Sequence, residues 1–192
     1  MELFELIKYR RSIRKYQNRQ VTREDLEKIT EAGLYAPNAG GGQRTMIVAL
    51  RSRELCEKVG RLNFAQFDRS RLAGSFVSLE QPSIIDNPSI ANGFYGAPAV
   101  CAVFAPANFL YSVPDAFCCA ENMVLAAAEL GLASCIIARG EETFAGSAGA
   151  ALLKGWQVPE NYIARCFVIL GYLAGPYPTG KPRKTGRCVI VE

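Results

Sequence analysis

The spacing of apolar residues predicts four helices along the chain. In each of them, apolar side chains recur three or four positions apart and gather on one side of a helix. Thr22 is followed by Glu24 and Asp25, a pattern that favours a helix start because acids in the first turn interact well with the helix dipole. The predicted helices cover residues 2–9, 22–36, 52–59 and 114–130. The last of these is apolar on nearly all sides, which indicates a central, buried helix.

Continuous apolar runs predict strands between these helices. The runs cover residues 45–50, 99–105, 134–138 and 163–173. Strands that alternate with helices are typical of a layered α/β or α+β domain. Residues 62–96 follow neither pattern and contain several Ser, Asn, Gly and Pro, so we expect an irregular excursion there. No linker or internal repeat interrupts the chain, and we therefore expect a single domain over residues 1–192.

The C-terminal segment differs from the rest of the chain. From Gly175 onward, Pro176, Pro178 and Pro182 prevent regular structure, yet the chain ends in the apolar run 188–191. We expect an arm followed by a small strand that docks on another surface, such as the sheet edge of a partner subunit. The alternative is a frayed tail, since termini fray unless something ties them down.

Size, charge and cysteine usage fit an ordinary globular protein of the cytoplasm. The chain has 192 residues, of which 49% are hydrophobic and 21% charged, and its formal net charge is +4. That excess is too small for a nucleic-acid surface. No apolar run reaches the roughly 20 residues that cross a bilayer, and the N-terminus lacks a signal-peptide pattern. The seven cysteines form no C-x-x-C pair and stand mostly in apolar runs, as buried thiols of a reducing compartment do.

The sequence contains no histidine. This excludes Ser-His-Asp and Cys-His catalysis, HExxH zinc sites and imidazole proton transfer, so a bound cofactor is the simplest carrier of chemistry. Two nucleotide-binding patterns also fail. Residues 175–181 have the spacing of a phosphate loop, but Pro182 replaces the magnesium-binding hydroxyl and two prolines remove backbone donors. No G-x-G-x-x-G follows a strand, so a Rossmann site is not indicated.

A basic cluster follows the first predicted helix. It consists of Arg10, Arg11, Ser12 and Arg14. Forked guanidinium groups and a hydroxyl in one short stretch suit a terminal phosphate, which accepts several charge-assisted hydrogen bonds. Two or three such bonds, each of ~1.5–3 kcal/mol, anchor a mononucleotide. The alternatives are a solvated basic helix end and a nucleic-acid contact; the latter is disfavoured because only two tyrosines accompany the cluster.

A turn of small residues lies between a predicted helix and a predicted strand. Residues 36–43 contain three consecutive glycines, and small residues let a backbone approach a flat ring closely. Gln43 adds an amide donor and an acceptor. The alternative is a flexible connector. The acids Asp115, Glu141 and Glu142 are interpreted as helix-end residues, Asp115 as a cap, rather than as catalytic groups.

Five stretches, taken in order, resemble the nitroreductase family of FMN-dependent enzymes, and the similarity covers nearly the whole chain. They are RRSIRKY at 10–16, VTREDLEKITEAGLYAPNAGGGQ at 21–43, GAPAVCAVFA at 96–105, ENMVLAAAELGLASC at 121–135 and GYLAGPYPTGKPRK at 171–184. The resemblance implies an α+β fold with a central mixed or antiparallel sheet flanked by helices. It also implies a homodimer with FMN at the interface and a C-terminal arm exchanged with the partner subunit.

The resemblance further implies which residues bind FMN. The phosphate and ribityl chain would be held by Arg10, Arg11, Ser12 and Arg14. One side of the isoalloxazine ring would be lined, from one subunit or the other, by Pro37, Asn38, Ala39 and Gln43. The other side would be lined by Ser134, Cys135 and Ile136. Asn63 would offer an amide to the polar edge of the ring, and Lys181 and Arg183 would reach the phosphate or the ring edge.

The implied activity is transfer of hydride from NADH or NADPH to a small oxidised acceptor, such as a nitroaromatic, quinone or enone, in a ping-pong cycle without a catalytic side chain. One alternative is a flavin-binding or sensing protein without turnover. Another is an enzyme of the same fold that performs reductive dehalogenation or flavin breakdown. The chain departs from the family pattern at Asn38, commonly Ser, at Gly41, commonly Asn, and at Arg44-Thr45, usually Pro-Trp. These departures bear on the flavin contacts of the turn and on substrate shape.

Overall fold

The computed structural model describes residues 1–67 and 76–192. Its α-helices are α1 (Leu3–Tyr9), α2 (Arg23–Leu34), α3 (Arg53–Ala65), α4 (Ser112–Glu129) and α5 (Ser147–Gly155). A short 3-10 helix, η1 (Ala39–Gly41), joins α2 to the first strand. The strands are β1 (Met46–Leu50), β2 (Ala99–Pro106), β3 (Ala133–Ile137) and β4 (Tyr162–Gly171).

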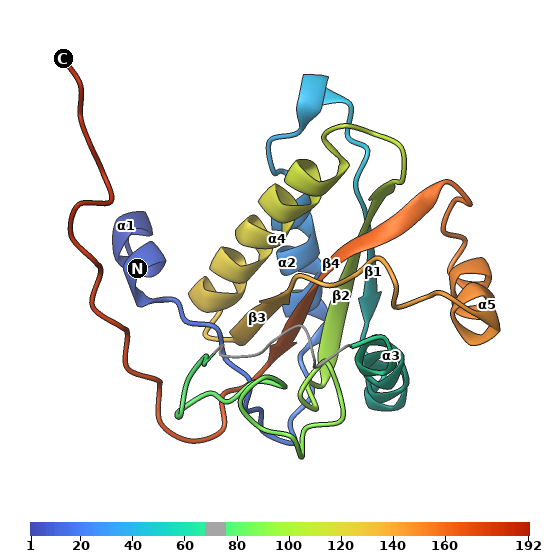
Figure 1. The fold of residues 1–192 in the computed structure, drawn as a ribbon, viewed down its shortest axis with the longest axis horizontal. Coiled ribbons are helices and arrows are strands. Elements are labelled where there is room, and N and C mark those ends of the chain that lie inside the picture. The colour runs from blue at the N-terminus through green and yellow to red at the C-terminus, as the bar shows by residue number, and fades with distance from the viewer. Residues whose placement is uncertain (68–75) are drawn as a thin grey trace.

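The four strands form one antiparallel sheet in the order β1-β2-β4-β3 (Figure 1). In the centre, β2 pairs with β4 so that Val100 lies opposite Ile169. The outer strands β1 and β3 pair with β2 and β4 respectively. The expected α+β fold with a central antiparallel sheet and flanking helices is therefore confirmed.

Helices cover both faces of the sheet because successive strand residues point to opposite sides. Cys101, Val103 and Val168 face a core formed with α2 and α4. Val100 and Phe167 face a second core, formed with α3 and α5. The two central strands are thus buried on both faces, which explains why their sequences read as continuous apolar runs.

Local signals in the sequence set where the helices begin and how closely they pack. The side chains of Thr22 and Ser52 each accept a hydrogen bond from the backbone N–H three residues on, so both act as N-caps. Gly33 brings α2 against α4, where a Cβ at this position would lie 2.7 Å from Cγ of Met123. The pair forms the helical layer on one face of the sheet.

Three predicted elements differ from the structure. The helix expected at 52–59 continues to Ala65, so the first residues of the expected irregular stretch 62–96 are helical. Helix α5 was not predicted, because Gly146 and Gly149 obscure its pattern. The run 188–191, expected to form a small strand docked on another surface, forms no strand within the single chain and is exposed; its docking on a partner stays a prediction. Residues 68–75 of the expected irregular stretch lie outside the described residues.

In the described ranges, no helix combines the length and the hydrophobicity that a bilayer span needs. All seven cysteines are free thiols. Five of them are buried, and Cys118 and Cys188 are exposed. The expectation that most cysteines behave as small buried hydrophobes therefore fits the structure.

Candidate functional site

The basic segment after α1 runs beside the edge strand β3. The backbone N–H of Ile13 donates to the carbonyl of Ser134 at 2.8 Å, and Ser12 forms a parallel bridge with Ser134. The buried thiol of Cys135, the next residue, donates to the carbonyl of Ile136 at 3.5 Å, and burial raises its pKa. Two of the predicted groups of site residues, the basic cluster and the start of β3, therefore meet in one chain. Burial in apolar surroundings makes this thiol a poor nucleophile.

The arginines of this segment hold unpaired buried donors. Four buried side-chain nitrogen or oxygen atoms of the described chain lack a hydrogen-bond partner, and three of them are Nε of Arg10, Arg11 and Arg14. Such donors are costly unless a ligand or solvent satisfies them. Arg11 and Arg14 also donate through Nη1 to backbone carbonyls of the chain, while all three Nε donors stay unpaired. Unpaired guanidinium donors that stand this close together in sequence suit an anion such as a phosphate.

The C-terminal arm begins next to this cluster. Tyr177 stacks on Tyr9 with ring centroids 4.4 Å apart, and its hydroxyl donates to the Tyr9 carbonyl at 3.0 Å. Gly180 lies against Arg11, since a Cβ there would be 2.0 Å from the Arg11 guanidinium. Lys181 donates to the carbonyl of Val77 at 2.8 Å and so adds a further cation. Arg183, two residues further along, is exposed on the arm.

The small-residue turn 37–43 is held from two sides. Its Ala39 N–H donates to Oδ1 of Asp115 at 3.0 Å, and Arg44 donates to the Ala39 carbonyl at 3.1 Å. Within the turn, Asn38 accepts from the Gln43 N–H at 2.8 Å, and Gln43 has a positive φ of 47°. We expected Asp115 to cap its own helix, but it binds the turn instead. Its Oδ2 is the fourth unpaired buried atom.

Within a single chain, the turn and the basic cluster lie at opposite ends of α4. Asp115 places the turn at the first turn of this helix, whereas the cluster lies beside β3, which follows the last turn. An 18-residue helix is about 27 Å long. Figure 1 shows the separation, with η1 at one end of the molecule and the segment after α1 near the other. Pro37, Asn38, Ala39 and Gln43 are therefore not brought to Arg10–Arg14 of the same chain.

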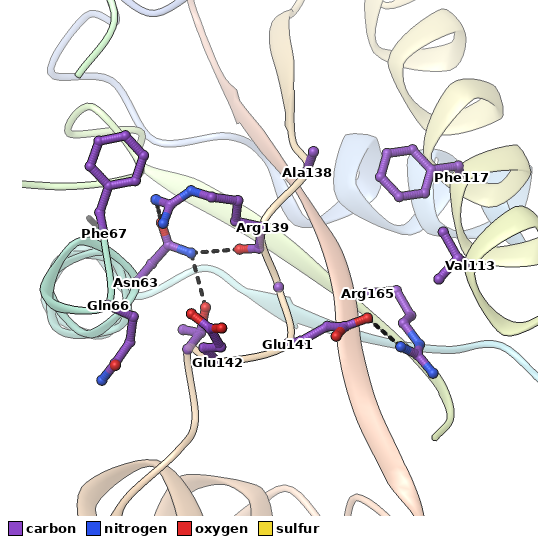
Figure 2. Close-up of a pocket in the computed structure, with 12 residues that line it drawn as sticks. Asn63, Gln66, Phe67, Val113, Phe117, Ala138, Arg139, Glu141, Glu142 and Arg165 are labelled. Atoms are coloured by element: carbon purple, nitrogen blue, oxygen red, sulfur yellow. Dashed lines mark hydrogen bonds and ion pairs between the residues drawn. The ribbon is translucent and has the colours of Figure 1, made fainter. Parts of the chain in front are cut away.

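A pocket of about 350 Å³ lies where β3 ends. Figure 2 shows Phe67, Asn63 and Arg139 on one side of it and Phe117 and Val113 on the other. Other lining residues come from the loop after β3 and from β4; these are Ala138, Gly140, Glu141, Glu142, Thr143 and Arg165. β3 therefore connects the basic cluster to the pocket, with half-buried Ile136 between them. From Ser134 to Ala138 the distance is about 13 Å at 3.3 Å per residue.

Asn63 lies in this pocket but uses its amide within the chain. Its Nδ2 donates to the Arg139 carbonyl at 2.7 Å and to the Thr143 hydroxyl at 2.9 Å. The residue is 1% exposed. Asn63 therefore connects the end of α3 to the loop after β3. It would affect a bound ligand indirectly, by holding this loop in place.

Arg165 closes the other side of the pocket from a β-bulge in β4. The register pairs Val103 with Cys166 and Phe104 with Ala164, so Arg165 is the extra residue of the bulge. Its Nε donates to Ser112 at 2.8 Å, its Nη2 donates to two carbonyls at the end of β2, and its Nη1 pairs with Glu141. The bulge thus turns a buried cation toward the start of α4 and the pocket loop.

Sequence reasoning missed three residues of this site: Asp115 as a turn anchor, Arg139 and Arg165. Arg165 carried a usable signal, because it is the one charged residue inside the apolar run 163–173. Arg139 directly follows a predicted strand, where residues of binding loops often stand, but its neighbours gave no chemical pattern.

Comparison with known proteins finds similarity over nearly the whole chain. The model of the "Nitroreductase family" matches residues 7–172. A protein of Archaeoglobus fulgidus named "Putative NADH dehydrogenase/NAD(P)H nitroreductase" is 31% identical over 177 residues, which are 89% of this chain and 85% of that protein. A Bacteroides fragilis nitroreductase with bound FMN is 31% identical, with a TM-score of 0.82 over 100% of both chains. A nitroreductase with bound FMN from Desulfitobacterium hafniense is 25% identical, with a TM-score of 0.79, and the match covers 100% of this chain and 99% of that one.

Proposed function

Because the chain belongs to the nitroreductase family, we propose that it binds FMN and transfers hydride from NADH or NADPH to a small oxidised acceptor. The observation that carries this proposal is the set of three unpaired, buried arginine Nε donors beside β3, with a pocket at the far end of the same strand. The phosphate of FMN would complement the charge of the arginines, and its flat ring would complement the shape of the pocket.

The residues present fit FMN. Arg10, Arg11, Ser12 and Arg14 would hold its phosphate, and Lys181 contributes positive charge from the arm. Ser134, Cys135 and Ile136 would line its path, since they follow one another along β3 between the cluster and the pocket. Asn63 would act by fixing the pocket loop. When bound, FMN supplies the redox chemistry, and so no side chain has to act as nucleophile or acid.

The turn 37–43 reaches such a site if it comes from a second copy of the chain. We therefore propose a homodimer in which Pro37, Asn38, Ala39 and Gln43 face the ring of the partner's site. Exposed apolar residues support an extended interface: Leu3 and Phe4 on α1, Tyr35 after α2, and Val189 to Val191 on the arm. The arm, with Arg183, would cross to the partner in this arrangement. A cytoplasmic setting is supported by the seven free thiols.

The acceptor and the order of steps are part of the proposal. With the flavin ring in the pocket of about 350 Å³, the side of the ring that stays open would take one small planar molecule at a time. Nicotinamide and acceptor would then use the same space in turn, which is a ping-pong cycle, with a nitroaromatic, quinone or enone as acceptor. A non-catalytic flavin-binding protein, or one that dehalogenates or breaks down flavin, would use the same site.

Steady-state kinetics with FMN-reconstituted protein test this function. We expect NADH or NADPH oxidation that depends on a quinone or nitroaromatic, with parallel double-reciprocal lines when both substrates are varied. Bound FMN without reduction by either nicotinamide would favour the non-catalytic alternative. Halide release or loss of the flavin itself would favour one of the other two reactions.

Asp115→Ala is expected to weaken FMN binding by about tenfold while the chain stays folded. The substitution removes the acceptor of the Ala39 N–H, worth about 1.5 kcal/mol as a hydrogen bond to a charged group, and frees the turn that faces the ring. Fluorescence titration of FMN measures the change. Asp115→Asn keeps an oxygen at that position and serves as the matched variant, with a smaller loss. Equal affinities for Asp115→Ala and the native chain would show that the turn does not contact the flavin.

A further inference from the structure

Arg139 lies in the pocket beside Asn63, the residue expected at the polar edge of the flavin. Its guanidinium is stacked over the Phe67 ring at 4.0 Å, and its Nη2 lies 3.5 Å from Oδ1 of Asn63. Nδ2 of Asn63 in turn donates a hydrogen bond to the Arg139 carbonyl. Figure 2 shows the three side chains together on one wall of the pocket. Position and orientation of this cation are therefore fixed by the fold.

No acid of the described residues forms an ion pair with Arg139. Of the two glutamates that line the pocket, Glu141 pairs with Arg165. Glu142 forms no ion pair with Arg139, but its negative charge acts on Arg139 from a distance and tends to raise the pKa of the guanidinium. Partial desolvation lowers the pKa of Arg139, although a guanidinium stays protonated. An anion that appears in this pocket would be stabilised by Arg139.

We propose that Arg139 supplies the positive charge that stabilises the reduced form of FMN and thereby raises its reduction potential in this protein. The inference rests on the proposed function. Hydride brings two electrons and one proton to FMN, so the reduced ring carries one additional negative charge, and the nicotinamide leaves in its oxidised form. A fixed cation at the pocket wall lowers the free energy of the reduced state more than that of the oxidised state.

The test is the reduction potential of bound FMN in Arg139→Gln, measured by equilibration with a reference dye. We expect the ratio of reduced to oxidised FMN at a given potential to fall about tenfold, a shift of about 30 mV for a two-electron couple. Reduced FMN should lose about tenfold more affinity than oxidised FMN. Arg139→Lys retains the charge and should stay within about threefold of the native ratio. Arg61→Gln, an exposed position on α3 paired with Glu57, is the matched control for loss of one charge.

A native potential in Arg139→Gln would overturn the proposal, and so would an equal shift in Arg61→Gln. A shift in Arg139→Lys as large as in Arg139→Gln would also overturn it, because it would assign the effect to loop shape instead of charge. Thermal unfolding of each variant controls for folding. Failure of the native protein to bind FMN at all would instead contradict the proposed function, so the two failures are distinguishable.

Discussion

Arg10→Gln is expected to weaken FMN binding by about 10- to 150-fold without destabilising the fold. Among the described residues, the Arg10 side chain has no hydrogen-bond partner, and its Nε is buried. Its removal therefore costs the chain little, whereas a bound phosphate loses one charge-assisted hydrogen bond of about 1.5–3 kcal/mol. Tenfold in affinity corresponds to about 1.4 kcal/mol. Quenching of FMN fluorescence gives both dissociation constants.

Riboflavin, which has the same ring and ribityl chain but no phosphate, makes this prediction specific. Its affinity should be equal in the native chain and in Arg10→Gln. Arg23→Gln removes an arginine that is paired with Glu27 on the surface of α2 and should leave FMN affinity unchanged. If Arg10→Gln weakened riboflavin and FMN equally, Arg10 would contact another part of the flavin and not the phosphate.

Arg165→Met is expected to lower the free energy of unfolding by about 2–4 kcal/mol. The side chain is buried in the bulge of β4. It donates hydrogen bonds to the hydroxyl of Ser112 and to the carbonyls of Pro106 and Ala107. Methionine fills much of the volume but donates no hydrogen bond, and each buried polar group left unpaired costs about 1–3 kcal/mol. The partner Glu141 is half exposed and regains water, which limits the loss. Urea unfolding followed by circular dichroism measures it.

Arg51→Met provides the comparison for this substitution. Arg51 also donates to a backbone carbonyl, that of Val21 at 2.8 Å, but it is exposed, so its loss should cost less than about 1 kcal/mol. If both variants lost the same free energy, the network around Arg165 would contribute no more than a surface contact. The bulge would then have no special role in holding the pocket loop.

The helices and central strands could be predicted because their signals are local. Thr22 caps α2 as its sequence indicates, and the runs at 99–105 and 163–173 are the two strands buried on both faces. Helix α5 was not predicted because it contains two glycines and shows little helical spacing of apolar residues. The terminal run 188–191 is exposed in the single chain, so no packing within the chain determines its conformation.

The candidate site could be predicted only in part, for a similar reason. The basic cluster is contiguous in sequence, so it could be recognised there. Its position beside β3 depends on a single bridge, between Ser12 and Ser134. The contact between Ala39 and Asp115 joins residues 76 positions apart, and so does the one between Asn63 and Arg139. Such pairs depend on how the helices pack on the sheet. They become visible only in three dimensions.

The proposed function requires that FMN binds with its phosphate at the arginines beside β3 and with its ring between two copies of the chain. A crystal structure of the FMN-loaded protein measures this directly. We predict phosphate oxygens within hydrogen-bond distance of Arg10, Arg11 or Arg14 of one copy, and the turn 37–43 of the other copy against the ring. FMN bound away from these arginines, or bound by a monomer whose own turn stays remote from the ring, would contradict it.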